Sequence, residues 1–152
     1  MRRIVLVAAA CAAAVALASC ASLQHSWDQG AVRQVADLLN AGQAQKLASM
    51  SVTPFLVDGE IVLIRTDVSS FWDGVAKAGF RVEGASLDQG TPVTAESYRQ
   101  FANTMEVKAF FSRYVKEDAR ILSMTSNTGS HILLLMRSEW FSRQIIGFKG
   151  PF

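Results

Sequence analysis

The stretch PFLVDGEIV, residues 54–62, places an Asp-Gly pair between two apolar runs. In this setting Asp-Gly is the strongest short-range signal for a two-residue β-hairpin turn. The apolar side chains then divide between the two faces of the hairpin. One face carries Leu56 and Ile61, and the other carries Phe55, Val57, Val62 and the polar Glu60. Neither face suits water, so both need to be covered by other parts of the molecule or by a partner.

The residues before the hairpin favour helices. A first helix is predicted from an N-cap at Ser26 to Leu39, because apolar residues recur on one helical face and a Gln stands three residues after the cap. The tripeptide Asn40-Ala41-Gly42 is expected to end it. A second, short helix is predicted over 43–50.

After the hairpin the pattern predicts a third helix and then a strand. Thr66 or Asp67 is expected to cap the helix, and Gly79 to end it. Its apolar side chains recur at helical spacing: Val68, Phe71, Trp72 and Val75. Phe80 and Val82 then alternate with charged residues, which predicts a strand with one solvent-exposed face.

The second half of the chain combines helical and strand patterns. Val93 and Thr94 resemble a helix start, and the apolar phase breaks near 103–106, which indicates a bend. Three strands are predicted after it, at 120–125, 132–136 and 144–148, with turns at 127–129 and around 140–142. The order of elements predicts an α+β fold in which helices cover one face of a curved antiparallel sheet.

The N-terminus has the pattern of an export signal. Arg2 and Arg3 precede an uncharged, Ala-rich run over 4–18. A positive n-region followed by an apolar h-region is typical of a secretory signal peptide. The run is shorter and less apolar than a permanent membrane-spanning helix requires.

Leu17-Ala18-Ser19-Cys20 resembles the lipobox of bacterial lipoproteins. The resemblance implies that a diacylglyceryl group modifies the Cys20 thiol and that cleavage before Cys20 makes it the first residue of the mature protein. It also implies a membrane in the cell envelope, and the outer membrane facing the periplasm if the host has two membranes, because Ala21 rather than Asp follows the cysteine.

Two alternatives are an ordinary signal cut after Ala18 and an uncleaved anchor helix. Cysteine usage argues against both. Cys11 lies inside the signal, so cleavage leaves Cys20 as the single thiol, and lipidation consumes it. Two or three acyl chains hold a protein at a bilayer essentially permanently.

This interpretation divides the chain into a signal at 1–19, a lipidated tether at 20–26 and a single α+β domain at 27–152. The 133 residues from Cys20 onward suffice for one core. The whole chain has 15 Lys and Arg against 13 Asp and Glu, and the signal contains two arginines and no acid, so the mature chain is neutral. The basic residues form no stripe with aromatic side chains, and nucleic-acid binding is not expected.

The mature chain also resembles the nuclear transport factor two-like (cystatin-like) superfamily. The segment 38–44, followed by Leu47 and a strand at Phe55, is similar to the opening of that fold, and 140–147 is similar to its last strand. The segment 94–115 is longer than the usual crossover. Resemblance to uncharacterised small bacterial lipoproteins of this type rests on 54–61, 105–107, 110–111 and 147–151.

The superfamily resemblance implies a cone-shaped domain with a pocket at its wide end. Leu56 and Ile61 are then expected to pack on helices, while the other hairpin face meets the pocket or a second subunit. A small apolar ligand or a protein partner would occupy the pocket. The candidate lining residues are Phe55, Val57, Val62, Phe71, Trp72, Tyr114 and His131.

Sequence motifs for catalysis or metal binding are missing: there is no phosphate loop, nucleophile elbow, paired-cysteine knuckle or metalloprotease helix. His131 with Asp67 or Asp73 is conceivable as an acid–base pair, but their spacing does not bring them together, and Asp67 is explained as a helix cap. We therefore expect no catalytic residue, metal or cofactor, and a non-enzymatic binding or envelope-assembly module. A small-molecule isomerase or hydrolase using the pocket, or a homodimeric scaffold, are the alternatives.

Overall fold

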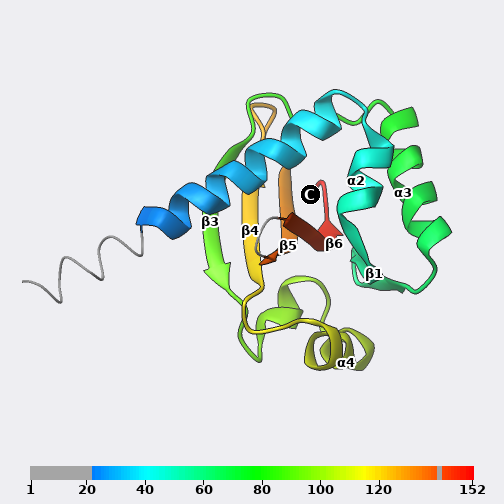
Figure 1. Cartoon of the computed structure of the whole chain (residues 1–152), viewed down its shortest axis with the longest axis vertical. Coiled ribbons are helices and arrows are strands. Elements are labelled where there is room, and N and C mark those ends of the chain that lie inside the picture. Colours follow the sequence, from blue (N-terminus) through cyan, green and yellow to red (C-terminus); the bar gives the residue numbers. More distant parts are fainter. Residues whose placement is uncertain (1–21, 140–141) are drawn as a thin grey trace, which may run out of the picture.

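In the computed structural model, six strands from the described part of the chain form one curved sheet in the order β2-β1-β6-β5-β4-β3 (Figure 1). The structure describes residues 22–139 and 142–152, so Cys20, the signal and the centre of the turn predicted around 140–142 lie outside the described residues. The strands are β1 Ser51–Val57, β2 Glu60–Val62, β3 Ser86–Pro92, β4 Arg120–Thr125, β5 His131–Glu139 and β6 Ser142–Lys149.

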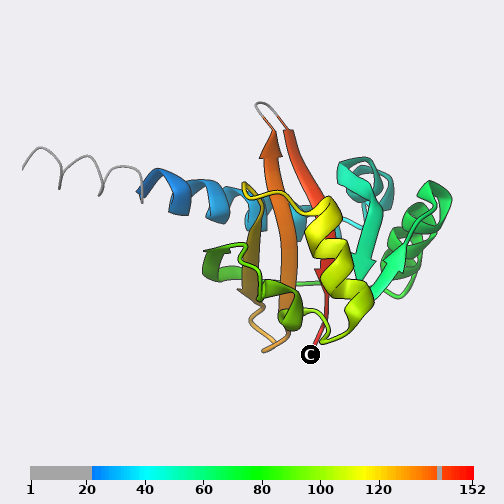
Figure 2. The ribbon, with the colours of Figure 1, turned by 90° about the horizontal axis from the view of Figure 1, so that it is seen from below.

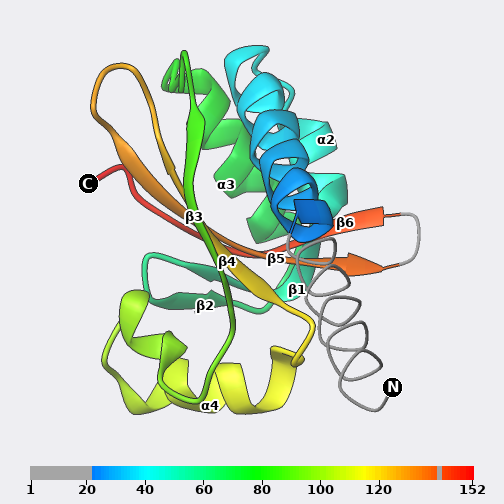
Figure 3. The same ribbon diagram turned by 90° about the vertical axis from the view of Figure 1, so that its left-hand side faces the viewer.

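Helices lie on both faces of this sheet (Figure 3). One face packs against the N-terminal helix, which is helical over 22–40, and against α2 (Ala44–Met50) and α3 (Arg65–Lys77). The opposite face packs against the short 3₁₀ helix η1 (Ser97–Gln100) and α4 (Met105–Tyr114). The α+β class is confirmed, with helices on two faces rather than one.

The hairpin predicted from residues 54–62 is confirmed in its register. Phe55 pairs with Val62, Leu56 with Ile61 and Val57 with Glu60. Asp58 and Gly59 both have positive φ, 49° and 98°, as a turn of this length requires. Helices cover both faces of the hairpin, since Phe55 belongs to the core under α2 and α3 while Leu56 belongs to the core under α4.

The sheet is not wholly antiparallel. β1 pairs with β6 in parallel, and the register between them shifts between Ser51 and Leu56. Pro54 lies inside that interruption. A residue without an N–H group is tolerated here because the ladder is already broken.

The strand predicted at Phe80–Val82 is wrong. This segment is irregular, and the Val82 N–H donates to Asn40 Oδ1 at 2.7 Å, so the end of the N-terminal helix binds it. The strand next to it is β3, which pairs with β4 along the edge of the sheet. Long-range pairing, not local preference, makes SLDQGTP a strand.

Two predicted helix starts also differ. Ser26 is not a cap, because residues 22–25 are already helical, and this helical stretch includes most of the segment assigned to a tether. The third helix has Ile64 at its N-cap without a side-chain cap bond, so Thr66 and Asp67 lie in its first turn. The break near 103–106 is confirmed: Thr104 caps α4, and its side chain accepts a bond from the Val107 N–H.

Candidate functional site

The interior expected to hold a pocket is filled by aromatic side chains. Phe55 and Trp72 are fully buried, and their ring centroids lie 6.0 Å apart. Phe71 lies 4.8 Å from Trp72, and Phe148 of β6 lies 5.4 Å from the same ring. The Trp72 indole N–H donates to Ser51 Oγ at 2.8 Å, which satisfies its polar atom.

The structure brings together five of the seven candidate lining residues. Phe55, Phe71 and Trp72 form the aromatic cluster, and Val57 and Val62 pack against the same core. Tyr114 lies on the opposite side of the sheet, half exposed, with its ring 5.6 Å from that of Phe110.

His131 is an exposed residue at the start of β5, on the sheet face away from the aromatic cluster. Its Nδ1 lies 2.9 Å from Thr125 Oγ1, and the same hydroxyl bonds Asp88 Oδ2 at 2.5 Å. Because an ionised carboxylate only accepts, Thr125 donates to Asp88 and His131 Nδ1–H donates to Thr125. The His131 ring stacks on that of Phe152, with the ring centroids 6.3 Å apart. These local contacts account for the position of the His131 side chain.

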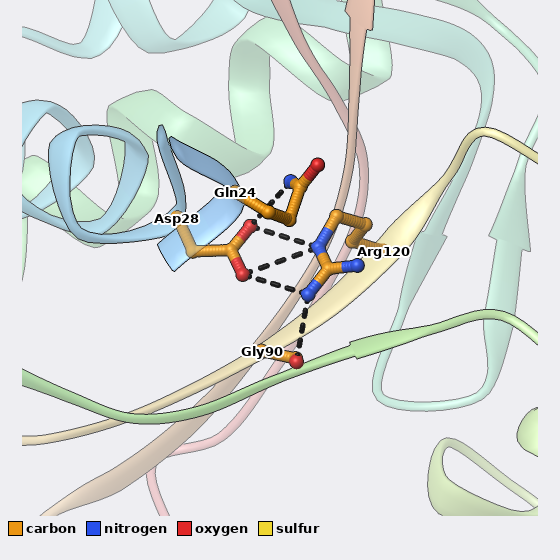
Figure 4. A network of polar contacts seen from close by, with 4 residues as sticks. All are labelled: Gln24, Asp28, Gly90 and Arg120. Atoms are coloured by element: carbon orange, nitrogen blue, oxygen red, sulfur yellow. Dashed lines mark hydrogen bonds and ion pairs between the residues drawn. The ribbon is translucent and has the colours of Figure 1, made fainter. Parts of the chain in front are cut away.

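A buried ion pair joins the N-terminal helix to the sheet (Figure 4). Arg120 donates from Nε to Asp28 Oδ1 and from Nη2 to Asp28 Oδ2, both at 2.8 Å. Arg120 Nη2 also reaches the Gly90 carbonyl at 2.7 Å, and Gln24 donates to Asp28 at 3.2 Å. The Asp28 side chain is 2% exposed and that of Arg120 is 17% exposed.

Gly90 is required at this point by the close approach of the helix. A Cβ at residue 90 would lie 2.7 Å from Cγ of Asp28 and closer still to a carboxylate oxygen. Strand β4 thus supplies Arg120, and the missing side chain of Gly90 on β3 leaves room for the Asp28 carboxylate. Opposite charges and a bidentate geometry leave this cluster with no net charge to offer a ligand.

Beside the ion pair lies a mostly apolar pocket of about 450 Å³, our candidate functional site. It is lined by Leu23, Gln24, Trp27, Asp118, Arg120 and Ser138. Arg143 of β6 places its guanidinium 5.6 Å from the centre of the Trp27 ring and donates to the Gly30 carbonyl and to Gln34 Oε1. We call Leu23, Trp27 and this pocket the helix-root surface. This surface combines apolar side chains with charged and polar side chains beside them, so it suits a partner that is apolar in one part and polar in another.

Other features of the described residues add no reactive site. Within 22–139 and 142–152 no cluster of His, Cys, Asp and Glu could hold a metal ion. A second hollow, of about 630 Å³, lies between residues 93–96 and the segment of α4 and 115–117, and has mixed charges from Glu96, Lys108, Lys116 and Glu117. The hydrogen bond with Tyr98 and the charge of Glu96 raise the pKa of the exposed Arg99 guanidinium. None of the described helices is long and apolar enough to cross a bilayer.

Comparisons with known proteins add a distant similarity of fold. No protein-family profile matches the chain. No curated protein matches it significantly. A solved structure from Nostoc punctiforme, described as a domain of unknown function with a cystatin-like fold, is similar over 77% of this chain and 69% of that chain. Its sequence identity is 16% and the TM-score is 0.38, so the likeness says nothing about a ligand or an activity.

The Asp28–Arg120 pair escaped prediction because 92 residues separate its members. A signal was present in the helix itself. Asp28 stands four and seven residues before Val32 and Val35, on the stripe that is buried. A charged side chain on a buried stripe needs a partner of opposite charge. The helix pattern therefore indicated that a basic residue elsewhere in the chain pairs with Asp28.

Proposed function

We propose that this chain is the precursor of a membrane-anchored bacterial lipoprotein, and that its single α+β domain is a non-enzymatic binding or envelope-assembly module. The observation that carries the proposal is the order of Arg2 and Arg3, the apolar run over 4–18 and the box Leu17-Ala18-Ser19-Cys20. Cys20 is the lipid attachment site. The protein then works at the cell envelope, and in a host with two membranes at the periplasmic face of the outer membrane.

The packing of the domain supports binding rather than catalysis. Phe55, Phe71, Trp72 and Phe148 occupy the space in which a cone-shaped enzyme would hold a small substrate. The buried ion pair has its hydrogen bonds inside the protein, and the pocket beside it is mostly apolar. These features favour a small apolar ligand or a protein partner at the surface.

Intact-mass analysis of the protein purified from its native host tests the anchor. We expect a chain that begins at Cys20 and carries diacylglyceryl and acyl groups. A Cys20→Ser variant should carry no acyl groups and keep its signal segment uncleaved, because lipidation precedes the cut. An unmodified thiol on the wild-type chain, or another first residue, would refute the proposal. Mass spectrometry of proteins and small molecules that copurify with the lipidated form then identifies the partner.

A homodimeric scaffold is the second candidate. Leu63 and Ile64 follow β2, the edge strand, and both side chains are exposed. An edge strand with apolar neighbours can pair with another chain. Light scattering on the detergent-solubilised protein separates a dimer from a monomer, and a Leu63→Lys variant should dissociate a dimer formed at this edge.

A further inference from the structure

We infer that the helix-root surface is the face with which the domain lies on a phospholipid bilayer. The inference rests on the proposed lipidation of Cys20 and adds what that proposal leaves open, the orientation of the domain at the membrane. The occupant of this surface is the lipid headgroup layer with the first methylenes beneath it.

The covalent chain limits the distance between anchor and domain. The described helix includes Ser22, two residues after Cys20, and Leu23 follows it. Even fully extended, three residues span only about 10 Å. A bilayer's headgroup region adds about 5 to 8 Å on each side of the hydrocarbon core. A lipidated Cys20 therefore holds Leu23 within or beside the headgroups.

The residues at this place have the chemistry of an interfacial contact. Leu23 is 71% exposed, and the first turns of the helix extend past the β3 edge of the sheet (Figures 1 and 2). Trp27 lies one turn further on and lines the same pocket. Trp is favoured at membrane–water boundaries because its ring is apolar and its N–H is polar. The Arg143 guanidinium over this ring adds a cation that suits lipid phosphates.

The helix is also fixed to the rest of the domain. Asp28 binds Arg120 on β4, and Arg143 on β6 binds the Gly30 carbonyl and Gln34. A rigid helix so near the anchor transmits its orientation to the whole sheet. The domain should therefore lie on the bilayer in one orientation instead of swinging on a tether.

The test uses the lipidated protein reconstituted in vesicles of phosphatidylethanolamine and phosphatidylglycerol. Cys20 is blocked by lipid in this form and Cys11 is removed with the signal, so a single new thiol can carry a spin label. Leu23→Cys places the label on the helix-root surface. Met105→Cys is the matched control, since Met105 is 76% exposed and starts α4, on the sheet face opposite the N-terminal helix.

We expect the label at residue 23 to lose accessibility to a water-soluble nickel reagent several-fold on reconstitution, and the label at residue 105 to keep it. Equal accessibility at both positions, with mass spectrometry showing lipid on Cys20, would refute the contact between the helix-root surface and the bilayer. The lipoprotein assignment would still stand. A free Cys20 thiol in the same preparation would overturn both.

Discussion

Replacing Asp28 by Asn tests the ion pair that fastens the N-terminal helix to the sheet. The substitution keeps the shape of the side chain but removes its charge, so Arg120, 17% exposed, retains only the Gly90 carbonyl as a strong partner. Breaking one partner of a buried pair typically costs 3–5 kcal/mol, and the partial exposure of Arg120 places the expected loss at about 3 kcal/mol. For a domain of this size that loss lowers Tm by about 10 °C.

Urea unfolding of the purified protein, followed by circular dichroism, measures this loss. The exposed pair of Arg99 and Glu96, 3.0 Å apart with side chains 60% and 62% exposed, is the control. Glu96→Gln should change the free energy of unfolding by less than about 0.5 kcal/mol. The double variant Asp28→Leu with Arg120→Met should recover much of the stability, because it leaves no unpaired charge. A loss below about 1 kcal/mol for Asp28→Asn would refute the buried pair.

Three further substitutions, and a fourth as a control, test local contacts by the same unfolding measurement. Gly90→Ala should destabilise the domain by about 2 kcal/mol or more, since the new methyl overlaps the carboxylate of the ion pair; wild-type stability would contradict this. Trp72→Phe should cost about 1–3 kcal/mol because it leaves the Ser51 hydroxyl without its donor and shrinks a filled interior, whereas no loss would indicate a hollow core. Thr104→Ala should cost about 1 kcal/mol as a lost N-cap, while Thr66→Ala, without a cap bond, should cost less; equal losses would contradict the cap assignment.

Local patterns predicted the elements that depend on neighbouring residues. The Asp58-Gly59 turn fixed the hairpin register because only a few residue types tolerate its backbone. The strand at 120–125 has the predicted bounds, and its apolar side chains enter both cores, Leu122 and Met124 one and Ile121 the other. The helical phase break before Met105 marked a real helix start, with Thr104 as its cap.

Elements fixed by distant partners could not be predicted in this way. β3 consists of residues with low strand preference and exists because β4 offers a free edge. The parallel pairing of β1 with β6 joins residues about 90 positions apart, with no local signal. Periodicity placed Tyr114 and His131 correctly on a helix and a strand, but it carried no information on which face of the sheet each would meet.

The last strand in the chain lies at the centre of the sheet. β6 separates the β1–β2 hairpin from the β5-β4-β3 meander, so these two halves share no ladder until residues 142–149 have been synthesised. Contacts between such distant segments make folding slow, because a long loop must close before they form. Under the export proposed above, this order keeps the sheet incomplete while the residues before 142 cross the membrane.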